Sequence, residues 1–225
     1  MVPDLPNADA RARTRRSQQY FNRFSLFFYD RLLYGLVSRR AWSCPPPELD
    51  RHYARSISQN HLEVGVGTGY LLDRATGLGP TPRLALLDLS SSCLEKTARR
   101  VARYAPTLYQ RNLLEPIVLD APGFDSIAVN FVLHCVPGGF AAKGVAFDHL
   151  KPLLNPGGVL FGATVLNRGV QKKPFARLCL ALLNGLGVFN NRADDLHELR
   201  ACLQRQFSQV EVRVMGVTAL FVVRV

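Results

Sequence analysis

Three glycines alternate with other residues directly after an acidic side chain, in the run Glu63, Val64, Gly65, Val66, Gly67, Thr68 and Gly69. Glycine adopts positive φ without strain and lets a ligand approach the bare backbone. The dinucleotide pattern G-x-G-x-x-G differs, because it places a pyrophosphate at a helix N-terminus. Glu63 would repel a pyrophosphate but suits a cationic amino group. The spacing therefore predicts a site for a ligand that carries an amino group, and an incidental glycine loop is the alternative.

A second acidic residue ends an apolar run ~20 residues after the glycine turn, where a carboxylate can accept hydrogen bonds from both hydroxyls of a ribose. The run covers residues 84–89, with Asp88 followed by Leu89 at its end. Asp88 is therefore predicted to bind a ribose. The alternative is an acid that caps the next helix, a role that Ser90 or Ser91 can take instead.

Two further stretches place an amide beside an apolar residue at the ends of predicted strands. Asn112 and Leu113 follow residues 107–110, and Asn130 and Phe131 lie near the end of the apolar run 124–133. Ligands of open α/β sheets bind at the carboxyl ends of the strands, so these residues are expected near the glycine turn. A plain surface loop is the alternative for the Asn112 stretch.

These stretches, in this order, resemble the class I S-adenosylmethionine-dependent methyltransferases over about residues 60–166. The similarity is greatest to the small ubiquinone/menaquinone-biosynthesis-like and type 11/12 members. It implies S-adenosyl-L-methionine as the cofactor and S-adenosyl-L-homocysteine as the product. It also implies methyl transfer to a small, hydrophobic or aromatic metabolite, while the acceptor atom stays open.

The resemblance also implies a role for each matching residue. Glu63, the three glycines and Thr68 would hold the methionine part, and Asp88 with Leu89 would bind the ribose. Asn112 stands where the family usually has Asp, and its amide oxygen can still accept a hydrogen bond from the adenine amino group beside Leu113. Asn130 and Phe131 would form the wall along the methionine part.

His134 follows the fourth predicted strand, where the methyl group is expected to point. Methyl transfer needs the acceptor aligned with the methyl and the sulfur, and some acceptors must also lose a proton. The near-neutral pKa of an ordinary histidine suits that task, so His134 is the candidate base. A histidine that hydrogen-bonds a loop or lines the pocket is the alternative.

The acceptor pocket is expected to lie under two apolar segments outside the core. One is a predicted helix over residues 17–37, in which aromatic residues recur at helical spacing and which includes Tyr29 as a candidate contact. The other is residues 175–189. Apolar walls fit a hydrophobic or aromatic acceptor, although ordinary core packing is the alternative for any one of these residues.

Strands and helices alternate through the middle of the chain, which predicts an α/β fold with helices on both faces of a parallel sheet. Two final strands around Gly216 have no helix between them and should pair antiparallel. We expect a Rossmann-like three-layer sandwich with a seven-stranded, mostly parallel sheet, an antiparallel last strand and an N-terminal helical cap. The expected parts of this single domain are 1–15 (tail), 16–58 (cap), 59–168 (cofactor-binding core), 169–192 (substrate-side insertion) and 193–225 (closing helix and strands).

The formal net charge of +11 over 225 residues raises the question of an anionic partner. A tight cluster occurs only at Arg11, Arg13, Arg15 and Arg16, so the charge reads as dispersed and nucleic acid as an unexpected partner. A nucleic-acid methyltransferase stays an alternative, although the chain lacks an N-P-P-[YFW] clamp and a Pro-Cys pair near His134. A second alternative is a non-catalytic protein that binds the cofactor for a partner chain.

Five cysteines without a C-x-x-C pair argue against a disulfide framework and a metal site. We expect a cytoplasmic protein, because an apolar leader is not visible among Pro3, Asp4 and Pro6 and the longest apolar runs are too short to span a bilayer. The oligomeric state is open, and a homodimer is one possibility.

Overall fold

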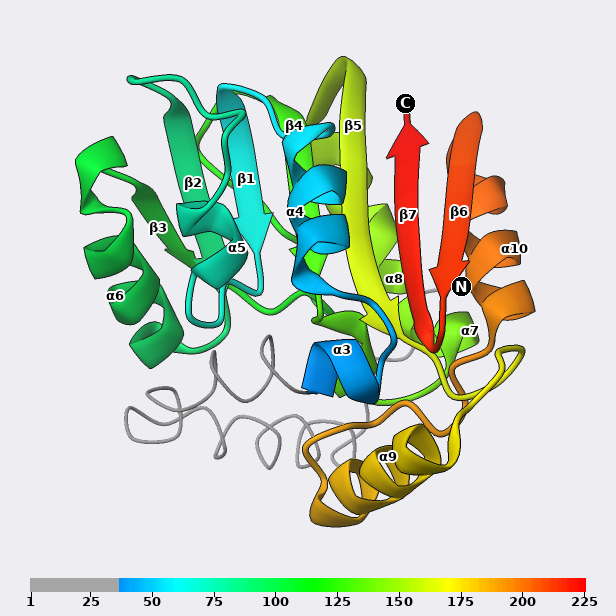
Figure 1. Ribbon diagram of the computed structural model, residues 1–225. Coiled ribbons are helices and arrows are strands. Elements are labelled where there is room, and N and C mark those ends of the chain that lie inside the picture. Colours follow the sequence, from blue (N-terminus) through cyan, green and yellow to red (C-terminus); the bar gives the residue numbers. More distant parts are fainter. Residues whose placement is uncertain (1–36) are drawn as a thin grey trace.

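The computed structural model describes residues 37–225, which form a seven-stranded sheet between two layers of helices. The strands are β1 (Asn60–Val64), β2 (Arg83–Asp88), β3 (Thr107–Gln110), β4 (Phe124–Asn130), β5 (Leu154–Val165), β6 (Gln209–Met215) and β7 (Thr218–Arg224). Their order in the sheet is β3-β2-β1-β4-β5-β7-β6 (Figure 1). Neighbours from β3 to β5 pair parallel, whereas β7 is antiparallel to both β5 and β6. The predicted mixed sheet with an antiparallel last strand is confirmed.

The helices cover both faces of the sheet. Their bounds are α3 (Ser38–Arg40), α4 (Pro46–Ala54), α5 (Tyr70–Asp73), α6 (Ser91–Arg100), α7 (Phe140–Lys143), α8 (Val145–Leu150), α9 (Pro174–Leu186) and α10 (Leu196–Gln206). In Figure 1, α4, α5 and α6 lie in front of the sheet, and α7, α8 and α10 lie behind it. The expected three-layer sandwich is therefore present.

Alternation along β4 explains why both faces need cover, because successive strand residues point to opposite sides. Ile127 and Val129 belong to the apolar cluster that contains Phe147 of α8. Ala128, between them, belongs to the cluster that contains Tyr53 of α4. A strand with apolar residues at every position thus requires helices on both sides.

Strand β5 begins earlier than its sequence indicates. The run Asn155, Pro156, Gly157 and Gly158 predicts a turn before a strand starting at 159, but β5 already begins at Leu154. Phe124 pairs with Leu154 and Ser126 pairs with Val159, so residues 155–158 bulge out of the ladder opposite Asp125. Asn155 Nδ2 donates to Asp125 Oδ1 at 2.6 Å and holds the bulge to β4. The extra residues lengthen the strand instead of ending it.

The chain between β5 and α10 forms a separate layer below the sheet. Here α9 packs its buried residues, Ala176 and Leu180, against Trp42 and Phe189. The Trp42 and Phe189 rings stack with centroids 5.8 Å apart. The predicted tail, most of the predicted 17–37 helix and Tyr29 lie outside the described residues.

Candidate active site

A cavity opens at the carboxyl ends of β1, β2 and β4, where ligands of parallel sheets bind. The cavity gathers predicted site residues from four separate stretches of the chain. These residues are Glu63, Gly65, Gly67, Thr68, Gly69, Asp88, Leu89, Asn112, Leu113, Asn130 and Phe131. Sequence reasoning missed other lining residues, which include Tyr70, Ser90, Cys93, Arg111, Val132, Cys135 and Val136. Most of the missed residues adjoin a predicted one in the chain, which is the signal that could have found them.

The three glycines of the turn have positive φ of 67°, 52° and 72°, but their surroundings differ. A Cβ on Gly65 would lie 2.1 Å from Val132 Cγ2, and one on Gly69 would lie 2.7 Å from Thr97 Cγ2. A Cβ on Gly67 would meet no atom within 4 Å. Gly65 and Gly69 therefore permit close packing, whereas Gly67 presents bare backbone to open space.

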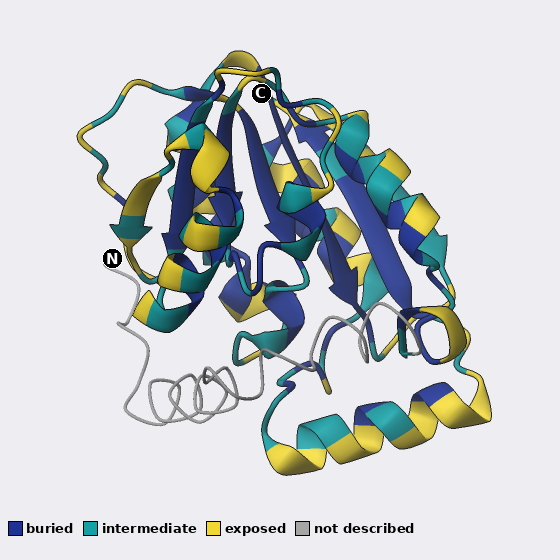
Figure 2. Cartoon of the chain, turned by 60° about the vertical axis from the view of Figure 1, so that its left-hand side comes forward, coloured by how far each residue is buried: buried dark blue, intermediate teal, exposed yellow. Residues whose placement is uncertain are grey.

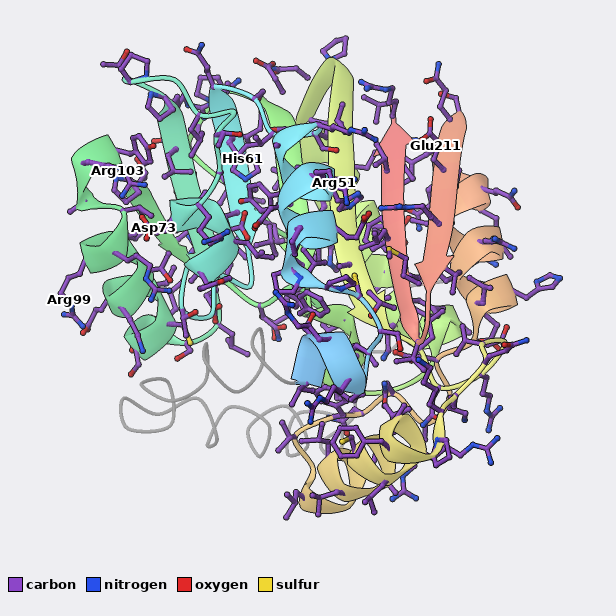
Figure 3. All side chains as sticks on the ribbon, in the orientation of Figure 1. Arg51, His61, Asp73, Arg99, Arg103 and Glu211 are labelled. Atoms are coloured by element: carbon purple, nitrogen blue, oxygen red, sulfur yellow. The ribbon has the colours of Figure 1, made fainter. Side chains whose placement is uncertain are left out.

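Helix α6 holds the glycine turn from behind. Thr97 Oγ1 donates to the Gly67 carbonyl at 3.2 Å, and Arg100 Nη1 donates to the Thr68 carbonyl at 2.8 Å. In the short 3-10 turn Ala102–Tyr104 that follows α6, Arg103 Nη1 lies 2.7 Å from Asp73 Oδ1 and joins this turn to α5. Figure 3 shows Arg103 and Asp73 close together at the edge of the molecule. The contacts from Thr97 and Arg100 occupy carbonyl oxygens of the turn and hold it against α6.

Glu63 is buried at the end of β1, and one of its oxygens is already bonded. The Tyr53 hydroxyl donates to Glu63 Oε2, and His61 Nε2 lies 3.1 Å from the same oxygen. His61 Nδ1 lies 2.7 Å from Ser126 Oγ on β4. His61 is labelled on β1 in Figure 3. The carboxylate is thus held in one orientation beside the glycine turn, and Tyr53 is a residue that sequence reasoning missed.

Asp88 sits at the end of β2 with its side chain partly open to the cavity. Burial raises the pKa of Asp88 to about 6. Hydrogen bonds from the backbone favour the ionised form and limit this rise, and their donors are Ser90, Gly67, Val66 and Leu89. The Ser90 amide lies 2.8 Å from Asp88 Oδ1. Ser90, not Asp88, caps α6, because its Oγ accepts from the Cys93 amide at 3.4 Å. The capping alternative for Asp88 is thereby removed.

Asn112 already makes two local hydrogen bonds, so a contact with adenine has to use the capacity that they leave. Its Oδ1 accepts from the Leu114 amide at 3.0 Å, and its Nδ2 donates to Glu115 Oε1 at 3.0 Å. A carbonyl oxygen has two lone pairs, so Oδ1 retains room for one further donor. Leu113 beside it is buried and also lines the cavity.

The end of β4 combines an unpaired polar atom with a strained backbone. Asn130 Nδ2 is buried and has no hydrogen-bond partner within the described residues. Phe131 has φ of 58°, a conformation that non-glycine residues seldom adopt and that concentrates at functional sites. The Phe131 amide donates to the Ala163 carbonyl at 2.7 Å, which keeps the strained residue in place.

Comparisons with known proteins agree with this geometry. Residues 62–160 match the family described as methyltransferase domain. The demethylluteothin O-methyltransferase of Streptomyces thioluteus is 37% identical over 204 residues, covering 91% of this chain and 89% of that protein. The methyltransferase verB of Penicillium polonicum is 38% identical over 223 residues, covering 91% and 96%.

This chain belongs to the class I S-adenosylmethionine-dependent methyltransferases. The structure of the DhpI complex with S-adenosylhomocysteine has the same fold, with a TM-score of 0.68 at 19% identity over 96% of this chain and 97% of that one. The cofactor of this methyltransferase is S-adenosylmethionine. The site fits that molecule, because Gly67 leaves space at the backbone and Asn130 Nδ2 is a buried donor without a partner.

The structure places His134 apart from the cofactor cavity of the methyltransferase. His134 is 2% exposed and is not among the described residues that line the cavity. Its Nδ1 accepts from the Val165 amide at 3.4 Å, and its ring centroid lies 4.2 Å from that of Phe189. Burial, together with the Lys143 charge, lowers the pKa of His134 to about 3. The expectation of a near-neutral pKa was therefore wrong, because the sequence does not show this burial.

A buried clamp holds the turn that contains His134. Lys143 Nζ donates to the Leu133 carbonyl at 2.9 Å and lies 2.8 Å from Asp194 Oδ1, with both side chains fully buried. The backbone amide of Asn190 donates to the His134 carbonyl at 2.8 Å, and its side-chain Nδ2 donates to the Cys135 carbonyl at 2.9 Å. The segment after α9 thus fixes a turn whose residue Cys135 lines the cavity.

No group of three or more His, Cys, Asp or Glu side chains in residues 37–225 is arranged to hold a metal ion. Across the same range, none of the helices has both the length and the apolar character that crossing a bilayer requires.

Proposed function

We propose that this methyltransferase methylates a small, hydrophobic or aromatic metabolite. The observation that carries the proposal is the composition of the cavity wall beyond β4. Phe131, Val132 and Val136 line that wall, with Cys135 between them. The names of the relatives support the same substrate class, since they include the demethylluteothin O-methyltransferase and a physcion biosynthesis cluster O-methyltransferase of Aspergillus chevalieri.

The bound cofactor supplies a methyl group on a sulfonium, and transfer to the acceptor is an in-line displacement. The protein must therefore align two molecules and keep water out. We assign the alignment of the cofactor to the glycine turn, Glu63 and Asp88, with Asn112 and Leu113 beside the adenine. Asn130 Nδ2 would donate to an oxygen of the methionine part, and Phe131 would shield the methyl group.

For His134 we propose a packing role in place of proton removal. A histidine with a pKa near 3 is uncharged at neutral pH and holds a proton too weakly to act as an efficient base. Its contacts are with the Val165 amide and the Phe189 ring. An acceptor that is already ionised at neutral pH, or whose proton leaves to water during the transfer, needs no such base.

The test is transfer of a labelled methyl group from S-adenosylmethionine to a panel of small phenols, amines and thiols, with bulk RNA as a further substrate. Labelled product from a small apolar acceptor is the expected result. Label in RNA alone would overturn the proposal in favour of the nucleic-acid alternative. Cofactor binding without transfer to any acceptor would favour the non-catalytic partner protein.

His134→Ala tests the assignment of His134 within the same assay. If His134 has a packing role, His134→Ala and Phe189→Ala should lower turnover to a similar extent, and the pH profile of the reaction should not change. Loss confined to His134→Ala, with removal of one ionisation from the pH profile, would restore the general base.

We also propose a cytoplasmic location, which the state of the cysteines supports. All five are free thiols in the structure, and Cys44, Cys93 and Cys202 are buried. Burial raises the pKa of Cys44 and of Cys93 to about 12, which keeps these thiols protonated and unreactive. Free buried thiols suit a reducing compartment.

A further inference from the structure

Helix α9 carries a row of exposed apolar side chains, and none of them is among the described residues that line the cavity, although residues 175–189 were expected to roof it. Phe175, Leu178, Leu182 and Leu186 are 43%, 65%, 59% and 49% exposed. Their spacing of three and four residues places them along one side of the helix, next to the side whose Ala176 and Leu180 pack toward Trp42. Figure 2 shows α9 at the edge of the molecule, apart from the sheet, with exposed residues along its outer side.

The same part of the chain is strongly cationic. Residues 166–193 contain no Asp or Glu. Their cations are Arg168, Lys172, Lys173, Arg177 and Arg192. Arg168, Lys173, Arg177 and Arg192 are exposed. An exposed apolar row with basic residues around it is the pattern of a helix that lies in the interface of an anionic membrane.

We propose that α9 docks this protein on an anionic lipid surface, with the apolar row in the acyl boundary and the basic residues at the headgroups. This inference is independent of the acceptor and of methyl transfer. Attraction between cations and anionic headgroups amounts to roughly fivefold in affinity for each Lys or Arg near the surface. Apolar burial adds to it, and the two signals together give reversible binding.

Two other occupants fit the row less well. In a symmetric dimer through α9, both partners would bring the same cationic segment to one interface, and like charges would repel. A protein partner needs a groove that matches the row, and a stable interface buries roughly 800 Å² on each side. A single projecting helix with four large apolar side chains offers a narrow ridge, which a fluid bilayer accepts without a matching shape.

The experiment is flotation of the full-length protein with two kinds of vesicle. One is made of phosphatidylcholine alone, and the other of equal parts phosphatidylcholine and phosphatidylglycerol. We expect flotation only with the anionic vesicles, weakened as salt is raised because screening shortens the range of the attraction. Absence of flotation with either vesicle would overturn the proposal.

Two double variants assign the binding to α9. Leu178→Ser with Leu182→Ser, and separately Lys173→Gln with Arg177→Gln, should each weaken the partition by roughly tenfold or more. All four side chains are exposed, so the thermal unfolding temperature should not change. Flotation that survives both double variants would show that another surface binds the lipid.

Matched controls lie elsewhere on the protein. Leu108→Ser changes an exposed leucine on β3, and Arg99→Gln with Arg224→Gln removes two exposed cations from α6 and β7. Figure 3 shows Arg99 at the left edge of the molecule, away from α9 at the bottom. The controls should keep the wild-type partition. If the control variants lose as much vesicle binding as the α9 variants, the binding depends on net charge and not on α9. If sedimentation shows a dimer for the wild type and a monomer for the leucine double variant, the apolar row binds a second copy of the chain.

Discussion

At the scale of single residues, the state of Asp88 links cofactor binding to pH. The folded-state pKa of about 6 lies above the ordinary 3.8, because burial favours the protonated form. Ionising Asp88 therefore lowers the free energy of unfolding as pH rises from about 4 to 6. The ionised carboxylate is also the form that accepts two ribose hydroxyls. Cofactor affinity should consequently fall as pH drops below about 6, in calorimetric titrations between about pH 5 and pH 8.

Asp88→Asn is the matched variant for that titration. It should bind the cofactor roughly ten- to a hundredfold more weakly at neutral pH, since a hydrogen bond to a charged group is worth ~1.5–3 kcal/mol. Its affinity should no longer change near pH 6. A pH dependence that persists in the variant would place the titrating group elsewhere.

Tyr53→Phe examines the orientation of Glu63. Removing the hydroxyl takes one donor from Glu63 Oε2 and leaves the ring packed in the core. We expect several-fold weaker cofactor binding and a loss of stability of ~1 kcal/mol. Tyr109→Phe on β3 is the control, and it should change neither quantity. Equal cofactor affinities of Tyr53→Phe and Tyr109→Phe would show that Tyr53 does not influence the cofactor site.

The glycines of the turn should respond differently to a methyl group. Alanine at a positive φ costs ~1–2 kcal/mol at either position. Gly65→Ala adds a clash with Val132 and should lower the denaturant midpoint further. Gly67→Ala meets no protein atom, so its larger effect should be on the Kd of the cofactor. Equal effects of the two variants on both measurements would contradict this division.

At the scale of elements, the Lys143–Asp194 pair joins α7 to the segment after α9. Burial lowers the pKa of Lys143 and raises that of Asp194 to about 6, while their mutual attraction opposes both shifts. Lys143→Met leaves a buried carboxylate unpaired and should destabilise the fold by ~3–5 kcal/mol in chemical unfolding. Adding Asp194→Leu should recover much of that loss. A double variant no more stable than the single one would show that the pair itself supplies the stability.

The elements also show what sequence patterns can and cannot predict. The glycine turn, the acid ending β2 and the alternation of strands and helices follow from local spacing, because each depends on neighbours in the chain. The burial of His134 and its low pKa depend on Phe189 and Lys143, which reach it only through packing. The clamp from Asn190 joins residues 55 positions apart, and no periodic pattern marks such a contact.

At the scale of the whole molecule, the fold separates two surfaces. The carboxyl ends of β1, β2 and β4 gather the residues proposed to bind the cofactor, while α9 presents exposed apolar and basic side chains at the edge. The sequence indicates that the net charge of +11 is dispersed, but part of it is concentrated around α9, because residues 166–193 contribute five cations and no acid. Cofactor binding and membrane docking should therefore be separable by mutation.

The central claim is that the cavity between the glycine turn and Asp88 binds the nucleoside cofactor. Isothermal titration of the full-length protein with S-adenosylhomocysteine tests it directly, with Asp88→Asn as the comparison. The account predicts one molecule bound per chain, with an affinity that the variant weakens at least tenfold. An absence of binding at roughly millimolar ligand, or equal binding by wild type and variant, would contradict it.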